Sequence, residues 1–462
     1  MSTDKTDAEL LEMDRKYCSW GDTVHYLNPP KCFARSEGSY LYDREGVAYL
    51  DLQMWYSAAN FGYANPRLNA ALTKQIETLP QLACQYLHSE KIELAAAIAR
   101  LNESRFGMEG RVHFNVGGSQ AIEDSLKLVR NATGKNLVFA FMGGYHGRTL
   151  AASAITSSYR YRRRYGHFSD RAHFVPFPYC FRCPYDKKVE SCELYCLKQF
   201  ERNFDTEYNS FWDAKAGESE FSAFYVEPIQ GTGGYVIPPP GYFAGLKKIL
   251  DERRILMVDD EIQMGFYRAG KFWAIENFGV APDIIVFGKA LTNGLNPLSG
   301  VWASEDLISP DVFPPGSTHS TFSSNTLGTA VALEAVRMMA ERDYEEITRR
   351  KGAYLLARIK DLHRRYPRVI GDTDGLGMAL RIEICGEDGF EPDRELADKI
   401  FAEGMKGDLT AGGKRMGLVL DVGGYYKNVF TLAPSFEITE AEIDLGVELL
   451  EQLIRRCAPG RV

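Results

Sequence analysis

The 462-residue sequence lacks the features of several large classes of protein. It has no apolar run near the ~20 residues that a membrane helix needs, and its first residues, MSTDKTDAELLEMDRK, include acids but no hydrophobic signal core. The net charge is −8, which disfavours a general surface for nucleic acid or anionic lipid. Nine cysteines, an odd number, argue against a disulfide framework. We expect a cytoplasmic protein that binds neither nucleic acid nor membrane.

The sequence also lacks internal repeats, low-complexity tracts and Gly/Ser-rich or Pro-rich linkers. Its length suits two or three domains, and its composition, 45% hydrophobic and 25% charged, is that of a soluble globular protein with a large core. Domains that no linker separates must be closely joined.

The middle of the chain predicts an α/β fold with a mostly parallel central sheet. Continuous apolar runs alternate with helical patterns such as residues 240–254, and this is typical of strands that are covered on both faces. The runs occupy residues 136–141, 222–226, 255–258 and 284–287. We assign residues 65–330 to a large α/β domain.

The two ends of the chain predict a second, smaller α+β domain, formed by residues 1–64 and 331–462. Residues 38–52 indicate a hairpin with Glu45-Gly46 at its turn. Residues 325–342 form a long helical pattern, and residues 369–384 and 428–436 indicate strands with an alternating pattern. The last helix has a Thr439 cap, with Glu442 three residues later.

Three short segments could carry chemistry. Gly117-Gly118-Ser119 lies between a strand and a helix, where backbone N–H groups bind phosphate. Asp260-Glu261 follows a buried strand, at the end where α/β proteins bind ligands. Lys289 follows the next strand, and its amine can form an imine with an aldehyde. Taken singly, each also has a structural explanation: a tight turn, a helix N-cap and a surface lysine.

The spacing of these segments favours a common site. Lys289 comes 29 residues after Asp260, which is enough for one helical crossover between adjacent parallel strands. A phosphate cradle, a carboxylate and a lysine on one edge of a sheet suit a phosphorylated aldehyde with a ring nitrogen. Pyridoxal 5'-phosphate is such a cofactor.

Six segments, in this order, resemble the class III aminotransferases, the ω-amino-acid branch of the fold type I pyridoxal-phosphate enzymes. They are NVGGSQAIEDSLKL (115–128), GGYHGRTLAA (143–152), VEPIQGTGG (226–234), MVDDEIQMGFYRAGKFWA (257–274), PDIIVFGKALTNGLNPLSG (282–300) and STFSSN (320–325). The resemblance implies fold type I, an aminotransferase activity and an obligate homodimer with a shared active site.

The resemblance also implies roles for individual residues. Lys289 would form the covalent imine and move the proton during catalysis, and Asp260 would keep the ring nitrogen protonated. The other implied cofactor contacts are Gly118 and Ser119 at the phosphate, Tyr145 on the ring face, Gln263 near the ring oxygen, Glu227 in the loop beside the site, and Thr321 at the phosphate of the neighbouring subunit.

One departure from the family pattern bears on the substrate. Many relatives carry a carboxylate-binding arginine where this chain has Thr431, whereas Arg148, which relatives use for the far carboxylate of an oxo acid, is retained. We therefore expect a donor without an α-carboxylate at the usual place, such as a diamine or amino sugar, and an acceptor such as 2-oxoglutarate or pyruvate. Arg415 or another basic residue could replace the lost arginine, and Arg148 could instead hold its loop through backbone carbonyls.

Two alternatives concern the chemistry of the site. A racemase or epimerase on the same scaffold needs a second acid, for which Tyr145, His146 or a pocket cysteine could serve. A non-catalytic regulator is disfavoured because Lys289 is present and no DNA-binding extension is visible.

The spacing of Cys180, Cys183, Cys192 and Cys196 could bind zinc. No histidine lies between them, so we expect reduced cysteines that pack a surface insert, and no metal.

Overall fold

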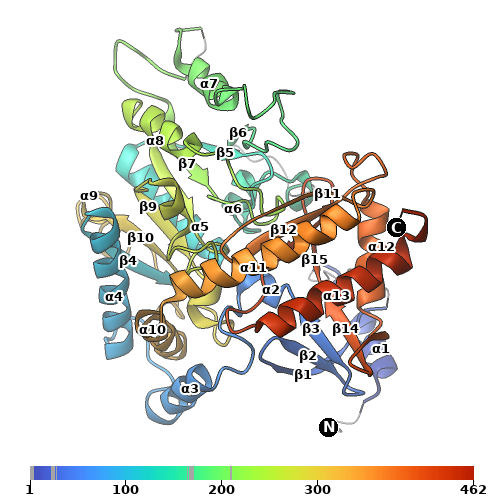
Figure 1. Ribbon diagram of the computed structural model, residues 1–462. Helices are drawn as coiled ribbons and strands as arrows, with labels where there is room; N and C mark the ends of the chain where they lie inside the picture. Colours follow the sequence, from blue (N-terminus) through green and yellow to red (C-terminus); the bar gives the residue numbers. More distant parts are fainter. Residues whose placement is uncertain are drawn as a thin grey trace.

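The computed structural model describes residues 5–21, 27, 29–163, 165, 171–208 and 211–461 (Figure 1). Its centre is a seven-stranded sheet. In spatial order the strands are β4 (Gly110–Asn115), β10 (Ser299–Ser304), β9 (Ile284–Phe287), β8 (Leu256–Asp260), β7 (Phe221–Val226), β5 (Leu137–Phe141) and β6 (His173–Val175). Only β10 runs against its neighbours. The mostly parallel sheet expected from the sequence is confirmed.

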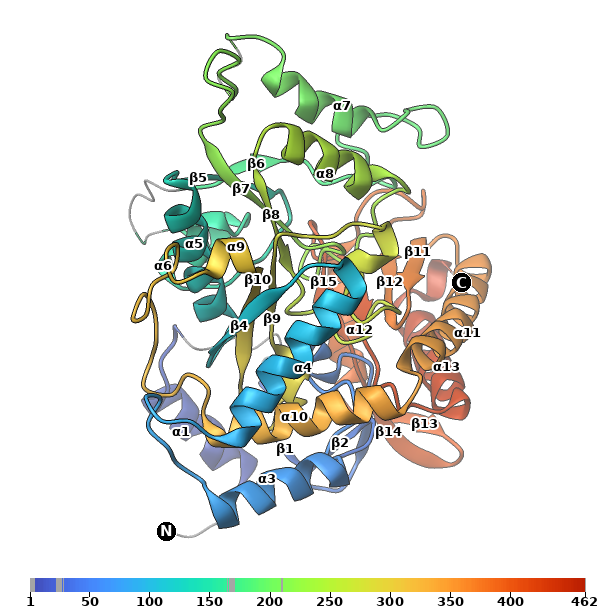
Figure 2. The same cartoon turned by 90° about the vertical axis from the view of Figure 1, so that its left-hand side faces the viewer.

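Two apolar layers cover the faces of this sheet. Val138 and Ala140 of β5 pack in one cluster with α5, whereas Phe139 and Phe141 face a larger cluster on the other side. This alternation explains why the strands are apolar throughout. Figure 2 shows α5 and α6 on one side of the sheet and α4 and α8 on the other. The covering helices are α4 (Ser89–Phe106), α5 (Gly118–Thr133), α6 (Leu150–Ile155), α8 (Tyr242–Glu252) and α9 (Glu305–Ile308).

The connection between β8 and β9 differs from the expected helical crossover. It contains only a 3₁₀ turn, η3 (Ala274–Phe278). The strands are nevertheless adjacent and parallel, with Asp260 paired to Val286. The irregular segment buries the side chains of Phe266, Phe272 and Trp273 against the core, and this packing replaces the helix.

Two smaller sheets contain the remaining strands, and only the first combines both ends of the chain. The first contains β1 (Phe33–Glu37), β2 (Tyr40–Asp43), β3 (Ala48–Asp51), β14 (Lys414–Val419) and β13 (Leu409–Ala411), in that order. The second contains β11 (Ile370–Leu376), β12 (Ala379–Ile384), β16 (Val429–Leu432) and β15 (Asp421–Gly423). The hairpin β2–β3 is confirmed, and β3 pairs in parallel with β14. We keep the division into 1–64, 65–330 and 331–462 as a proposal.

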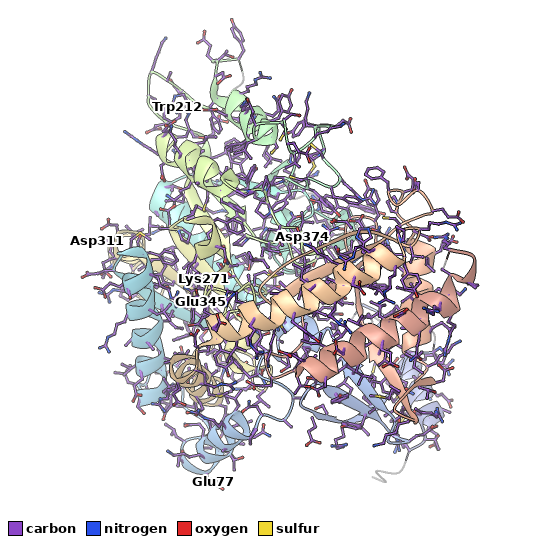
Figure 3. All side chains as sticks on the ribbon, in the orientation of Figure 1. Glu77, Trp212, Lys271, Asp311, Glu345 and Asp374 are labelled. Atoms are coloured by element: carbon purple, nitrogen blue, oxygen red, sulfur yellow. The ribbon has the colours of Figure 1, made fainter. Side chains whose placement is uncertain are left out.

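The expected alternation of buried and exposed residues is wrong for β12 and β16, because every residue of both strands is buried. Long helices that pack beside these strands explain the difference (Figure 1). They are α11 (Tyr344–Arg365), α12 (Arg394–Gly404) and α13 (Glu440–Cys457). An ion pair between Lys271 and Glu345 ties α11 to the segment after β8 (Figure 3).

The remaining elements are short or peripheral, apart from α10, which is the helix expected at 325–342. They are α1 (Asp7–Tyr17), α2 (Met54–Ser57), α3 (Pro66–Thr78), α7 (Tyr195–Glu201), α10 (Thr326–Glu341), η1 (Tyr159–Tyr161), η2 (Arg202–Phe204), η4 (Lys289–Thr292) and η5 (Pro459–Arg461). No described helix is long and apolar enough to cross a membrane.

The element α2 is a left-handed turn. Its four residues, Met54–Ser57, have φ values of 44°, 53°, 56° and 64°, although none is glycine. Each such residue costs about 1–2 kcal/mol, so surrounding contacts must hold the turn. The carboxylate of Asp51 supplies two of them by accepting hydrogen bonds from the N–H groups of Gln53 and Met54.

Candidate active site

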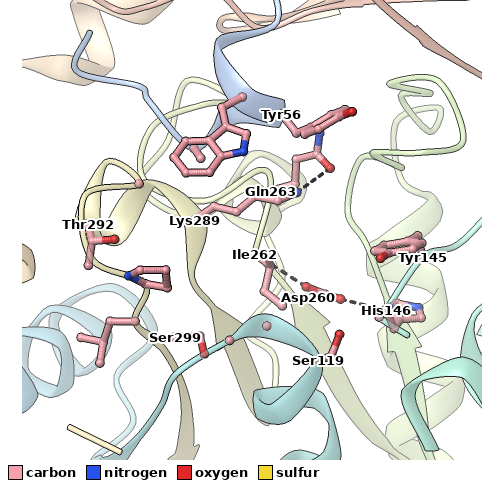
Figure 4. A pocket seen from close by; sticks show the side chains of 18 of the residues that line it. Tyr56, Ser119, Tyr145, His146, Asp260, Ile262, Gln263, Lys289, Thr292 and Ser299 are labelled. Carbon is pink, nitrogen blue, oxygen red and sulfur yellow. Dashed lines mark hydrogen bonds and ion pairs between the residues drawn. The ribbon is translucent and has the colours of Figure 1, made fainter. Parts of the chain in front are cut away.

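A cavity of about 330 Å³ lies beyond the carboxyl ends of β8 and β9 (Figure 4). It brings together the three segments that the sequence analysis singled out. Its lining includes Gly118 and Ser119 from α5, Asp260 from β8, Lys289 from η4, and Tyr145, Glu227 and Gln263 from loops. The ends of parallel strands meet at one edge of a sheet, which explains this convergence of distant segments.

The start of α5 offers backbone donors to an anion. Its N-cap, Gly117, makes no side-chain cap hydrogen bond, so the first N–H groups of the helix keep their capacity to bind phosphate. A Cβ at Gly118 would lie 2.9 Å from the end of the Ile262 side chain, so the helix start and Ile262 are closely packed. The Ser119 hydroxyl accepts a hydrogen bond from the N–H of Arg148 at 3.1 Å, and this contact holds the next loop against the helix.

Two neighbours hold the side chain of Asp260 in place. His146 Nδ1 lies 2.8 Å from Asp260 Oδ2, and the N–H of Ile262 donates to Oδ1 at 3.1 Å. Burial lowers the pKa of His146, but the hydrogen bond and charge of Asp260 outweigh it and leave that pKa above its ordinary value. His146 is thus engaged behind Asp260 (Figure 4) and is a poor second acid for racemisation.

The Lys289 amine lies inside the cavity, where Nζ donates to Gln263 Oε1 at 2.9 Å. Loss of water around the amine lowers the pKa of Lys289 to about 8, against the opposing charges of Asp260 and Glu227. Gln263 is fixed in turn, because its Nε2 donates to the Tyr235 hydroxyl at 3.0 Å. A lysine with a lowered pKa beside a carboxylate is a nucleophile suited to an aldehyde.

Glu227 organises the loop that carries Tyr145. Its two carboxylate oxygens accept hydrogen bonds from the N–H groups of Tyr145, at 2.8 Å, and Gly231, at 2.9 Å. Burial raises the pKa of Glu227 to about 7, and the charge of Asp260 adds to the rise. The Tyr145 ring meets Tyr161 edge to face, with centroids 5.3 Å apart, so Tyr145 is held at the cavity wall.

A second cavity, of about 240 Å³, shares Tyr56, Tyr145, Gln263 and Lys289 with the first. Its other charged lining residues are Arg148, Asp421 and Lys427. The Arg148 guanidinium lies over the Tyr161 ring, 4.5 Å from its centroid, and within the described residues no hydrogen bond from it to a backbone carbonyl is seen. The second cavity therefore has the size and polarity of a substrate site next to the cofactor site.

Three predicted residues lie outside these cavities, as far as the described residues show. Thr431 is buried behind Asp421, to which its hydroxyl donates at 2.5 Å. Arg415 lies exposed on the β13–β14 hairpin and donates to the carbonyl of Gly407 at 3.4 Å, so it does not replace the lost arginine. Thr321 is exposed beside Phe322, which is 69% exposed.

Sequence reasoning missed Asp421, Lys427 and the left-handed turn that carries Tyr56. None of these belongs to a motif, and only tertiary folding brings them to Lys289. A weak signal was present for Asp421, because it is the one acid between the apolar run 417–420 and the segment that contains Thr431.

The four clustered cysteines lie apart from this site. They line a separate cavity of about 20 Å³ near α7 and α8, and none of them lines the two cavities at Lys289. In the described part of the chain, no group of three or more potential ligands is arranged to hold a metal. Burial raises the pKa of Cys180 and of Cys196 to about 11, so both are neutral thiols at pH 7.

The donor set of the first cavity fits pyridoxal phosphate. The uncapped start of α5 suits the phosphate, Asp260 suits a protonated ring nitrogen, and Lys289 suits the aldehyde. All three line one cavity, which also has the Tyr145 ring in its wall.

Comparisons with known proteins give the same picture. The chain matches the family described as aminotransferase class-III over residues 23–454. It is 30% identical over 459 residues to the alanine/serine racemase of Pyrococcus horikoshii, covering 98% of this chain and 91% of that protein. It is 30% identical to the ornithine aminotransferase of Bordetella pertussis, with 92% of each chain covered. The crystal structure of a PLP-bound amine transaminase from an uncultivated Pseudomonas species superposes with a TM-score of 0.84 at 25% identity, covering 96% of this chain and 99% of that one.

Proposed function

The chain belongs to the class III aminotransferases, with the fold type I architecture and pyridoxal 5'-phosphate as cofactor. From this premise we propose that it moves an amino group from a terminal or non-α amine to an oxo acid. The observation that carries this proposal is the Lys289 amine, with a pKa lowered to about 8, in one cavity with Asp260 and the start of α5.

Several residues of the cavity have a defined task in this reaction. When bound, the cofactor supplies an aldehyde for amines and an electron-withdrawing ring. The N–H groups of Gly118 and Ser119 bind its phosphate, and the Asp260 carboxylate accepts a hydrogen bond from the protonated ring nitrogen. Lys289 Nζ would hold the cofactor through its aldehyde; once the substrate amine takes its place, the freed Nζ would act as the base and acid that moves the substrate proton. Tyr145 and Gln263, which line the cavity, would hold the cofactor ring in place.

Two features in and beside the second cavity support the proposed substrates. Thr431 cannot form the charge-assisted contact of about 1.5–3 kcal/mol that an arginine makes with an α-carboxylate. Arg148 remains at the cavity with its guanidinium over Tyr161, and there it can bind the carboxylate of an acceptor such as 2-oxoglutarate or pyruvate.

Racemisation is the second candidate, and the similarity to the Pyrococcus racemase favours it. It requires an acid on the face of the cofactor opposite Lys289. With His146 bound to Asp260 and the cysteines elsewhere, Tyr145 is the remaining residue of those considered. Incubation with a chiral amine in D₂O without oxo acid distinguishes the two activities. A racemase exchanges the Cα proton and inverts the configuration of Cα, whereas an aminotransferase converts the cofactor to its amine form.

The decisive test of the proposal is covalent attachment. We expect borohydride to trap pyridoxal phosphate on Lys289, found by peptide mass, and an amine without an α-carboxylate to abolish trapping until an oxo acid is added. Lys289→Ala protein should show neither effect. Trapping that no amine can relieve would contradict an aminotransferase.

A further inference from the structure

Asp421 lies beside Thr431, the position at which the family resemblance implies a carboxylate-binding arginine. Asp421 is the first residue of β15 and pairs directly with Thr431 of β16. The Thr431 hydroxyl donates to Asp421 Oδ2 at 2.5 Å, and Gln53 Nε2 donates to Oδ1 at 3.4 Å. The threonine thus orients a carboxylate at this end of the site.

This carboxylate has capacity for a ligand. Asp421 lines the second cavity together with Lys289 and Gln263, so a molecule whose amine reaches Lys289 extends past it. Its hydrogen-bond partners are a neutral hydroxyl and a neutral amide, and among the described residues it forms no ion pair. A carboxylate has about four acceptor positions, of which these partners use two.

Lys427 does not neutralise Asp421 by contact. It lines the same cavity, and its charge reaches Asp421, but its Nζ donates to the carbonyl of Val422 at 3.5 Å. Because the attraction between charges grows as their distance falls, an ammonium in direct contact with Asp421 would interact more strongly than Lys427 does.

We propose that Asp421 binds a second, non-reacting ammonium group of the amine donor, so that the donor class is the diamines. This inference rests on the proposed aminotransferase function and specifies its substrate. One ammonium group of the diamine lies at Asp421. The other loses a proton and reacts with the cofactor that Lys289 holds. A carboxylate acceptor then uses Arg148, and each of the two substrates has its own charged partner in one cavity.

The test compares diamines with monoamines of equal length, namely 1,4-diaminobutane with butylamine and 1,5-diaminopentane with pentylamine. Conversion of the bound cofactor is followed by absorbance without oxo acid. A charge-assisted contact predicts a kcat/KM about tenfold or more higher for each diamine. Asp421→Asn should reduce that ratio to about one, as expected for loss of one contact.

Three variants serve as controls. Asp311→Asn removes an exposed carboxylate at the edge of the molecule (Figure 3) and should leave the ratio unchanged. Lys427→Met should keep or raise the preference for diamines, because it removes a competing cation. Thr431→Arg supplies Asp421 with a permanent cation and should abolish the preference, so it decides the matter if Asp421→Asn fails to fold or to bind cofactor.

A binding measurement separates this inference from the catalytic proposal. In Lys289→Ala protein, which lacks the amine that moves the substrate proton, calorimetry should show 1,4-diaminobutane bound about tenfold more tightly than butylamine, a difference that Asp421→Asn removes. Diamine binding that depends on Asp421 without conversion of cofactor would refute the aminotransferase and retain this site. Equal affinities for diamine and monoamine, or an equal loss of affinity for both amines in Asp421→Asn, would overturn this inference. Conversion of the cofactor by the monoamine would still support the aminotransferase.

Discussion

At the scale of single residues, the chemistry of the site depends on how burial changes the charge of Lys289. Its ordinary pKa of 10.5 falls to about 8, because the amine loses water and the charges of Asp260 and Glu227 only partly compensate. The fraction of neutral amine at pH 7 thereby rises to about a tenth, several hundred times that of an exposed lysine.

This pKa predicts how the apoprotein takes up its cofactor. Only the neutral amine attacks an aldehyde, and its fraction grows as pH rises towards the pKa. We expect the rate of reconstitution with pyridoxal phosphate to rise about tenfold per pH unit below 8 and to level off above it. The measurement is the first-order appearance of the bound-cofactor absorbance between pH 6 and 10, with N-acetyl-lysine methylamide as the comparison. A protein profile that climbs to pH 10, as that of the model amine should, would mean that the cavity does not lower this pKa.

The residues of the site were predictable only where a motif marks them. Asp260 and Lys289 each follow an apolar run that becomes a buried strand, and Gly118 begins a helix. Asp421 has only the weak signal of an acid after an apolar run, and the turn Met54–Ser57 has none. Their contribution depends on β15 pairing with β16 and on a backbone conformation that β-sheet and helix propensities disfavour.

At the scale of elements, two helices share the same N-terminal capping motif but differ in their packing. Thr439 and Glu442 form a capping box on α13, and Thr6 and Glu9 form one on α1. α13 buries eight residues, including Leu450 and Leu453, whereas α1 buries none. A lost cap should therefore affect the stability of the whole protein only through α13.

We expect Thr439→Ala to lower the free energy of unfolding by about 1 kcal/mol, the usual cost of losing a Ser or Thr cap. Thr6→Ala is the matched control and should leave the urea midpoint unchanged while α1 frays. Midpoints from fluorescence, with circular dichroism for helix content, make the comparison. Equal shifts for both variants would show that α1 belongs to the cooperative core.

Helices and buried strands were predictable because each has a local signal. The capping box predicted α13, and uniform apolar runs predicted β7 and β9. The prediction of a helix between β8 and β9 was wrong, because a count of residues does not distinguish a helix from an irregular segment whose aromatic rings pack into the core. The burial of both faces of β12 depends on helices far along the chain.

At the scale of the whole molecule, the proposed homodimer would explain an isolated predicted residue. Thr321 lies outside the two cavities that the described residues form, next to the exposed ring of Phe322. The family resemblance assigns Thr321 to the phosphate of the neighbouring subunit. Each site would then combine Lys289 of one chain with Thr321 of the other.

Mixed dimers test this arrangement. Thr321→Ala alone should weaken cofactor binding about tenfold, by loss of a hydrogen bond to a charged phosphate. When Thr321→Ala and Lys289→Ala chains are refolded together, the mixed dimer contains one site with both residues intact. The cofactor concentration for half-maximal borohydride trapping should then return towards the wild-type value in the mixed fraction, because only sites that contain Lys289 are trapped.

The matched control pairs Lys289→Ala with Asp260→Asn, two residues of the same cavity in one chain. No mixed dimer of these chains contains an intact site, so affinity should not recover. Recovery in the first mixture and not in the second requires that Thr321 acts across the interface. Failure of both mixtures, with mixed dimers verified by mass, would place Thr321 outside the partner's phosphate site and leave the cavity at Lys289 as the complete binding site of one chain.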